Sequence, residues 1–167
     1  MTTNLSDAMV QEFVHEAAGT RKMLDRLPED KLSWKPHEKS MSLGRLASHL
    51  AEIAEWTGTI VNDDVFDMDA ADYKPADLDS KQAILDRFDA SVAQFESLMS
   101  GKTDEQLMQT WQMKQGGNVV LTMPRAVCLR SFVLSHAVHH RGQFSVYLRE
   151  NDVPLPAIYG PSADEAM

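Results

Sequence analysis

Two histidines four residues apart, His136 and His140, are the residues of this sequence best placed to do chemistry. They lie on the apolar face of a predicted helix, where side chains four apart are about 5–6 Å apart at their β-carbons, so both imidazoles can hold one ion. A divalent transition metal bound by two nitrogens needs a further ligand from another element. His49 is the other histidine that lies beside the core on a predicted helix, and we expect it to be the third ligand.

Three protein ligands leave one coordination position open, as in catalytic metal sites. At such a position a metal ion can lower the pKa of a bound water to about 7, or polarise a substrate oxygen. Imidazole nitrogens suit zinc, nickel, copper, iron and cobalt, so the ligand types alone do not identify the metal. The spacing alone also fits a hydrogen-bonded pair of core histidines. The metalloprotease motif HExxH is absent, because Ala137, Val138 and His139 separate the pair.

Neighbouring residues are candidates for supporting roles. His139 and Gln143 are candidates for hydrogen bonds to a ligand imidazole or to a substrate. Glu52, one turn after His49, could orient that ring, although we expect a solvated carboxylate there. Cys128 predicts a buried structural thiol, because no sequence feature near it would lower its pKa.

Four predicted amphipathic helices position the histidines, with apolar residues at three- and four-residue spacings. They run from Leu5 to Leu27, from Leu43 to Ile60 after an N-cap at Ser42, from a capping box at Asp79 to Gly101, and from Pro124 to Glu150. Four such helices with little strand signal predict an all-α fold of the four-helix-bundle type, whose core commonly holds metal sites.

The connections between these helices are expected to be irregular, with one exception. The Asp-rich stretch 62–79 lacks helical apolar spacing and predicts a solvated loop. Between Asp104 and Met123, a helical turn and alternating apolar residues around a Gly-Gly pair predict a short extended or hairpin segment before the last helix. Residues 153–167 predict an irregular C-terminal tail. At this length we expect a single domain, 1–167.

The composition argues against several classes of function. The chain has 167 residues, 43% of them hydrophobic, and a formal net charge of −9. This charge repels a nucleic-acid backbone and no cluster of Lys and Arg offsets it, so we expect no nucleic-acid partner. No stretch reaches roughly 18 consecutive apolar residues, so we expect no membrane span. A single cysteine and an N-terminal stretch without a signal-peptide pattern predict a cytoplasmic protein.

The sequence resembles the DinB superfamily along nearly its whole length. The resemblance rests on Leu46-Ala47-Ser48-His49-Leu50 followed by Trp56, on His136-Ala137-Val138-His139-His140-Arg141-Gly142-Gln143, and on Tyr159-Gly160-Pro161. It implies a four-helix bundle, a homodimer, and a metal held by one histidine of the second helix and two of the last, which correspond to His49, His136 and His140. Zinc and nickel are the metals expected first, with iron, cobalt and copper as alternatives. Some members of the family join a low-molecular-weight thiol such as bacillithiol or mycothiol to an electrophile.

Two classes of function therefore stand side by side. The favoured class is a metal-dependent enzyme acting on a small molecule, either a thiol-dependent S-transferase or a hydrolase. The alternative is a non-catalytic metal-binding stress-response or scaffold protein, in which an ion stabilises the packed helices. An accessible coordination position favours the first class, and a fully coordinated ion without turnover favours the second.

Overall fold

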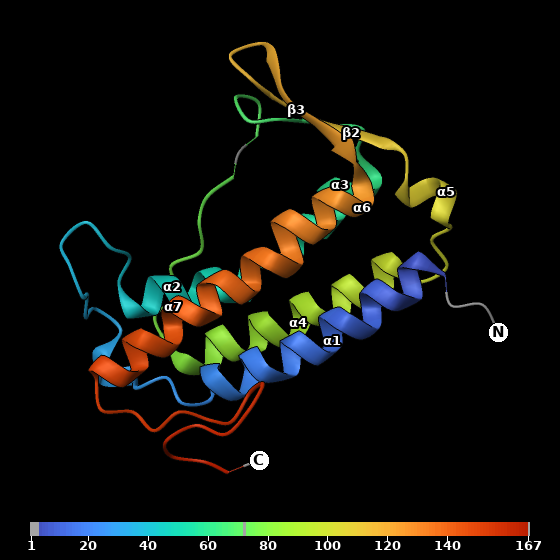
Figure 1. Ribbon diagram of the computed structural model, residues 1–167. Helices are drawn as coiled ribbons and strands as arrows, with labels where there is room; N and C mark the ends of the chain where they lie inside the picture. The colour runs from blue at the N-terminus through green and yellow to red at the C-terminus, as the bar shows by residue number, and fades with distance from the viewer. Residues whose placement is uncertain (1–3, 72, 167) are drawn as a thin grey trace.

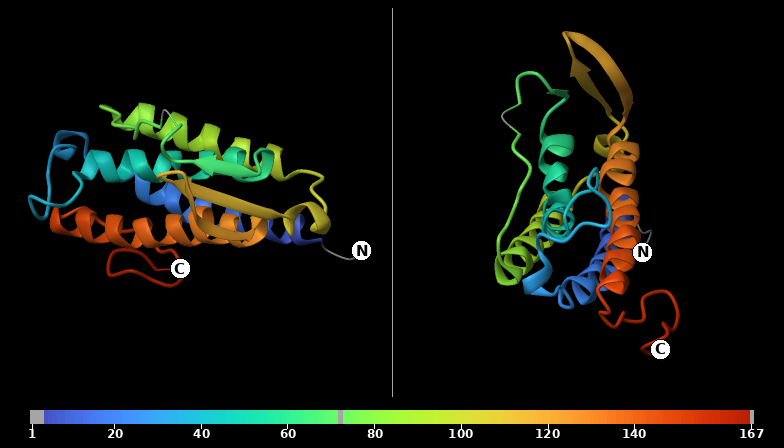
Figure 2. Two further views of the ribbon diagram at one scale, coloured as in Figure 1. Left: turned by 90° about the horizontal axis from the view of Figure 1, so that it is seen from above. Right: turned by 90° about the vertical axis from the view of Figure 1, so that its left-hand side faces the viewer.

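Helical segments from four parts of the chain lie side by side (Figure 1). The computed structural model describes residues 4–71 and 73–166. Within them α4 contacts both α1 and α2, and α7 contacts the same two helices. The four are α1 (Leu5–Leu24), α2 (Leu43–Glu52), α4 (Lys81–Met99) and α7 (His136–Glu150). The views of Figure 2 show these helices running alongside one another. Buried apolar residues of all four helices belong to one hydrophobic core.

The first helix begins after a polar N-cap residue. The Asn4 side chain accepts a hydrogen bond from the backbone N–H of Asp7. Phe13 is buried on the inner face of α1 and stacks on Phe95 of α4, with 4.0 Å between ring centroids. The helix ends at Leu24, three residues before the predicted Leu27. The apolar spacing misled the prediction because Leu27 is still buried, although it lies in the turn that follows the helix.

The second predicted helix is divided in the structure. Its N-cap at Ser42 is confirmed, since the hydroxyl accepts from the backbone N–H of Arg45. The α-helix stops at Glu52, a 3₁₀ turn covers Ile53–Glu55, and α3 (Trp56–Asn62) follows. Ile53 is 1% exposed, so the turn keeps the apolar face of this segment against the core.

The predicted capping box at Asp79 is wrong by one residue. Ser80 is the N-cap of α4, because its hydroxyl accepts from the backbone N–H of Ala83. A reciprocal capping box exists instead at Thr103 and Gln106, where it starts the short helix α5 (Asp104–Leu107).

The last predicted helix contains an irregularity that its sequence pattern hides. Helix α6 (Arg125–Leu129) continues into a π-helical turn, Arg130–Ser135, and then into α7. Leu129 and Val133 remain fully buried across this turn. Because a π turn holds more residues than an α turn, it shifts the phase of every side chain that follows it.

A three-stranded sheet lies beyond one end of the helices and consists of β1 (Val65–Asp67), β2 (Thr110–Gln115) and β3 (Asn118–Pro124). Strands β2 and β3 form the hairpin that the Gly-Gly pair predicts, with Gln115 opposite Asn118. Gly116 and Gly117 both have positive φ, as a two-residue hairpin turn requires. Strand β1 pairs in parallel with β2 and was not expected.

The hairpin projects away from the helices but is anchored at its base (Figure 1). Trp111 of β2 is completely buried, and its ring lies 6.5 Å from that of Phe66 and 6.2 Å from that of Phe132. The fold is therefore mostly helical with a small sheet, so the all-α prediction was incomplete, whereas the short hairpin before the last helix is confirmed.

The predicted irregular tail has neither helix nor strand between residues 153 and 166. Two ion pairs hold it to the rest of the chain: Arg26, in the turn after α1, pairs with Glu165, and Arg149 of α7 pairs with Asp164. The predicted acidic loop and tail also include Asp72 and Met167, which lie outside the described residues. Among the residues that are described, no helix is both long enough and apolar enough to cross a membrane.

Candidate metal centre

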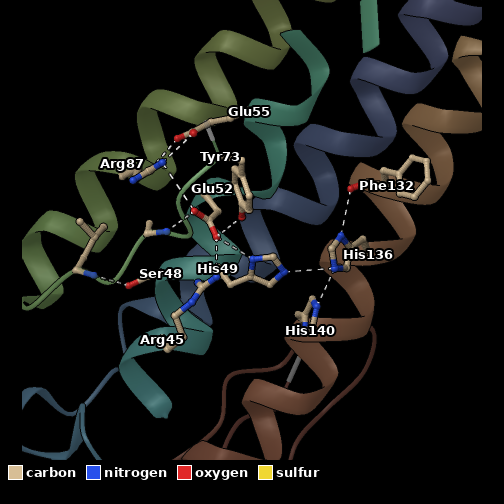
Figure 3. A network of polar contacts seen from close by, with 12 residues as sticks. Arg45, Ser48, His49, Glu52, Glu55, Tyr73, Arg87, Phe132, His136 and His140 are labelled. Atoms are coloured by element: carbon tan, nitrogen blue, oxygen red, sulfur yellow. Dashed lines mark hydrogen bonds and ion pairs between the residues drawn. The ribbon is translucent and has the colours of Figure 1, made fainter. Parts of the chain in front are cut away.

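His49 of α2 meets His136 and His140 of α7 in the space between the two helices (Figure 3). His49 Nε2 lies 3.3 Å from His136 Nε2, and His140 Nε2 lies 2.8 Å from the same atom. Two nitrogens bound to one metal at about 2.0–2.1 Å are roughly 2.9 Å apart at a right angle and about 3.3 Å apart at the tetrahedral angle. These two separations match those of nitrogens that share one ion, and the candidate ligand atoms of all three histidines lie within 4.8 Å of one another.

The second ring nitrogen of each histidine faces a hydrogen-bond acceptor. His49 Nδ1 lies 2.9 Å from Glu52 Oε1, and His140 Nδ1 lies 2.7 Å from Gln143 Oε1. His136 Nδ1 lies 3.3 Å from the carbonyl oxygen of Phe132. Acceptors at Nδ1 hold the proton there and leave the lone pair on Nε2, which is the tautomer that binds a metal.

The π turn explains why the Phe132 carbonyl is available to His136. At the end of this turn the backbone N–H of His136 donates to Val133, three residues back, while the side chain reaches the carbonyl of Phe132, four residues back. Single π turns inside α-helices are frequent at functional sites. Here the turn sits directly before the first histidine of the pair.

Glu52 is the centre of the polar network behind His49 and is only 2% exposed. Its Oε1 accepts from Arg45 at 3.1 Å and from the Tyr73 hydroxyl at 3.1 Å, in addition to His49. Its Oε2 accepts from the backbone N–H of Ala76 at 2.8 Å. Burial alone would raise the pKa of Glu52, but the bonds from His49 and Ala76 and the charge of Arg45 outweigh it and hold the pKa below its usual value. The expectation of a solvated Glu52 was therefore wrong.

The electrostatics keep the histidines of α7 in the form that binds metal. Burial lowers the pKa of His140 to about 4, with Gln143 opposing the shift, and burial and the nearby His49 lower that of His136. Protonation of either ring would place a poorly solvated charge beside the other histidines. Both rings are therefore neutral at pH 7 and present a free lone pair.

The other candidate residues separate into two groups. Gln143 contacts the ring of His140 directly, as the sequence allowed. His139 is exposed, and its ring lies 4.9 Å from that of His140, but it is not a member of the group of three histidines that could hold one ion. Cys128 is fully buried and burial raises the pKa of its thiol to about 11, so it is an inert structural residue.

The sequence analysis missed the residues that contact the site from outside α2 and α7. Tyr73 and Ala76 belong to the stretch predicted as a solvated loop, yet both return to Glu52, and the backbone N–H of Leu78 donates to Ser48 Oγ at 3.0 Å. No local pattern marks these contacts, because they join segments more than twenty residues apart. The three-residue spacing of His49 and Glu52 was a usable signal, since side chains so spaced are neighbours on a helix.

Three imidazoles that converge from two packed helices define this chain as a helical protein in which three histidines are positioned to hold a metal ion. A family comparison agrees with this class: the DinB family matches residues 1–167, and the chain belongs to that family. The uncharacterized protein YrdA of Bacillus subtilis (strain 168) is 31% identical over 161 residues, which cover 95% of this chain and 90% of YrdA.

Two solved structures share this fold. A DinB-like protein from Bacillus cereus ATCC 10987 has 26% identity and a TM-score of 0.69, covering 92% of this chain and 97% of its own. The DinB-like protein YjoA from Bacillus subtilis has 20% identity and a TM-score of 0.69, covering 90% and 96%, and supports the fold alone.

Proposed function

We propose that this protein binds one divalent transition metal ion, zinc or nickel foremost, through the Nε2 atoms of His49, His136 and His140. We further propose that it is a metal-dependent enzyme acting on a small molecule, of the thiol-dependent S-transferase or hydrolase type. The observation that carries the proposal is the convergence of three Nε2 atoms whose partner Nδ1 atoms all face acceptors. Three lone pairs aimed at one point repel one another unless a cation lies between them.

The donor set fits such an ion. Imidazole nitrogen suits zinc, nickel, copper, iron and cobalt, and no carboxylate or thiolate belongs to the cluster among the described residues. A bound ion supplies Lewis acidity at its remaining position, which activates either a thiol or a water as the nucleophile. A thiol cosubstrate is proposed from the family resemblance. No residue that the structure describes distinguishes a thiol from water as the nucleophile.

The chain's own residues orient the ligands and limit the access of water. Glu52 fixes His49 from one side, and the Phe132 carbonyl and Gln143 fix the two rings of α7. The side chain of His49 is only 13% exposed, so its bond to Glu52 is shielded from solvent. Such shielding strengthens the bond, because the dielectric screening is low.

Three further properties belong to the same proposal. The cyclic packing of α1, α4, α2 and α7 supports a four-helix bundle comprising one domain, 1–167. A homodimer is proposed from the family resemblance, and a cytoplasmic location from the single cysteine. The net charge of −9 supports a small-molecule substrate over a nucleic acid.

The test is the metal content of purified, untagged protein, measured by plasma mass spectrometry. We expect one transition metal ion per chain in the wild type and none in His49→Ala or His140→Ala. His139→Ala is the matched control, because it removes an adjacent histidine outside the cluster and should keep the metal. A wild type that binds no metal after reconstitution would refute the proposal.

Turnover separates the two classes of function. The metal-loaded wild type is compared with His140→Ala, which should hold no metal. Both proteins are assayed with electrophilic thiol acceptors in the presence of bacillithiol or mycothiol, and with ester substrates in the absence of either thiol. Activity that disappears with the metal supports an enzyme. A tightly bound metal with no exchangeable water, together with unfolding on chelation and no turnover, would support the stress-response or scaffold alternative.

A further inference from the structure

A cavity of about 250 Å³ adjoins the metal centre. Its wall is formed by Glu52, Glu55, Trp56, Thr59, Phe66 and Tyr73. Glu52 belongs to both places, because it lines the cavity and also orients His49 (Figure 3). A molecule in the cavity therefore lies against the carboxylate that holds a metal ligand.

Three aromatic rings surround this space at different angles. The centroid of the Trp56 ring is 5.0 Å from that of Phe66 with an interplanar angle of 69°, and 5.8 Å from that of Tyr73 with an angle of 54°. Rings tilted against one another cannot all stack on a flat ligand. They can surround a compact positive group, which the negative π faces attract.

The charged groups of the wall are carboxylates, and no cationic side chain is among the described residues that line it. Arg87 binds both oxygens of Glu55, at 2.7 and 2.9 Å, and Arg45 binds Glu52, but neither guanidinium forms part of the wall. Each carboxylate oxygen of Glu55 accepts one of these two bonds and keeps a second acceptor site. The wall thus includes carboxylate oxygens, whereas the guanidiniums that pair with them, with Arg87 also 3.9 Å from Glu52, are not among its lining residues.

The surrounding chain extends this polarity. Asp63 and Asp64 lie between α3 and the strand that carries Phe66, Asp67 ends that strand and Asp69 follows it, and of these four carboxylates Asp64 is paired with Arg125. The whole chain has a formal net charge of −9. A cavity lined by one sign of charge on a protein of the same sign concentrates ligands of the opposite sign.

We propose that this cavity binds an organic cation, an ammonium group joined to an apolar body, and that this is the class of small molecule on which the metal centre acts. The second part rests on the proposed function, whereas binding in the cavity does not. The ammonium group lies among Trp56, Phe66 and Tyr73 within reach of Glu55. Contact with Glu52 links an occupied cavity to the orientation of His49.

The test compares three small probes of similar body and different charge: benzyltrimethylammonium, benzyl alcohol and benzenesulfonate. The quaternary ammonium has no lone pair, so it cannot act as a metal ligand. Binding to the metal-loaded protein is followed by heteronuclear NMR through the indole N–H signals of Trp34, Trp56 and Trp111. We expect the cation to bind about tenfold more tightly than the alcohol, with no binding of the sulfonate, and to shift the Trp56 signal.

Matched variants separate the cavity from the rest of the protein. Phe66→Leu keeps the apolar volume but removes a ring, and Glu55→Gln keeps the shape but removes a charge; each should weaken the cation several-fold. Trp34→Phe alters a half-buried tryptophan that packs on Tyr147, away from the cavity, and should leave binding unchanged. Equal binding of all three probes, or binding unaffected by both cavity variants, overturns the inference.

Whether cation binding depends on the bound metal is tested separately. His140→Ala should lose the metal but still bind the cation in the cavity. Cation binding in a wild type that never holds metal would support the cavity as a binding site and refute only its role as the substrate site of a metalloenzyme. A metal-loaded protein that binds none of the probes refutes the inference and leaves the proposed function intact.

Discussion

Glu52→Gln is the substitution that most directly tests how the metal ligands are oriented. The change keeps the size of the side chain but replaces one acceptor oxygen with a donor. In the native protein Oε1 accepts from Arg45, His49 and Tyr73, and Oε2 accepts from the N–H of Ala76. The best placement of the amide keeps its oxygen towards His49 and turns its NH₂ group towards the Ala76 N–H. One buried donor then loses its acceptor.

Two magnitudes follow from this geometry. Loss of a partner that orients a metal ligand typically weakens metal binding about 10- to 100-fold, or about 1.4–2.7 kcal/mol, and the loss of charge behind His49 acts in this direction. The unpaired Ala76 N–H should lower the free energy of unfolding of the metal-free protein by about 1–3 kcal/mol. Because Glu52 is 2% exposed, water does not readily replace either contact.

Competition with a chromophoric chelator measures the metal affinity, and urea denaturation of the metal-free protein measures stability. Glu55→Gln is the matched control, since Glu55 also binds Arg87 but touches no histidine. We expect its metal affinity to stay within about twofold of wild type. If Glu52→Gln bound metal as tightly as Glu55→Gln, the negative charge that Glu52 places beside His49 would not strengthen metal binding, and the reasoning would be refuted.

Three other outcomes are expected. Gln143→Ala should weaken metal binding by less than Glu52→Gln does, roughly three- to tenfold in the same chelator competition. The reason is that Gln143 is neutral and exposed, so water can replace it at His140. A larger loss than that of Glu52→Gln would contradict this ranking. Glu16 binds buried Arg141 and the Tyr159 hydroxyl, each at 2.6 Å. These bonds outweigh the effect of burial and lower the pKa of Glu16. The contribution of Glu16 to stability is therefore present above about pH 4.5 and is lost as the pH falls through the lower pKa of the folded state. Glu16→Gln should therefore lower the free energy of unfolding by about 1–2 kcal/mol at pH 7 and by less at about pH 3; a constant difference across this range, in urea denaturation, would argue against the ion pair. The Cys128 thiol should resist alkylation at pH 8 in the folded protein and react in urea, and rapid alkylation of folded protein would show that it is accessible.

The three histidines were predictable from sequence because helical spacing is a local property. Four-residue spacing places His136 and His140 on one face, and the apolar stripe beside His49 turns that ring inward. The hairpin was predictable for the same reason, since a Gly-Gly pair between alternating segments specifies a tight turn. These features depend on residues that are close in the chain.

The features that were missed depend on residues far apart in the chain. Strand β1 exists because Val65–Asp67 pairs with β2, some forty-five residues later. Three residues are too few to show the alternation of apolar and polar side chains that predicts a strand. Tyr73 and Ala76 lie in an Asp-rich stretch whose composition is that of a loop, and only the buried carboxylate of Glu52 makes them part of the site. Whether Glu52 is buried depends on these later residues as much as on its own helix.

The π turn at Arg130–Ser135 makes the convergence of the three histidines depend on the backbone conformation of a segment that contains none of them. In a regular α-helix each residue advances the chain by about 1.5 Å and rotates it by about 100°. If the same residues formed a regular α-helix instead, His136 and His140 would swing about a quarter of a revolution away from His49 while their mutual spacing stayed intact. A homologue that lost the π turn without also losing one residue would therefore keep all three histidines and lose their convergence, whereas deleting one residue together with the π turn would leave the two histidines facing His49.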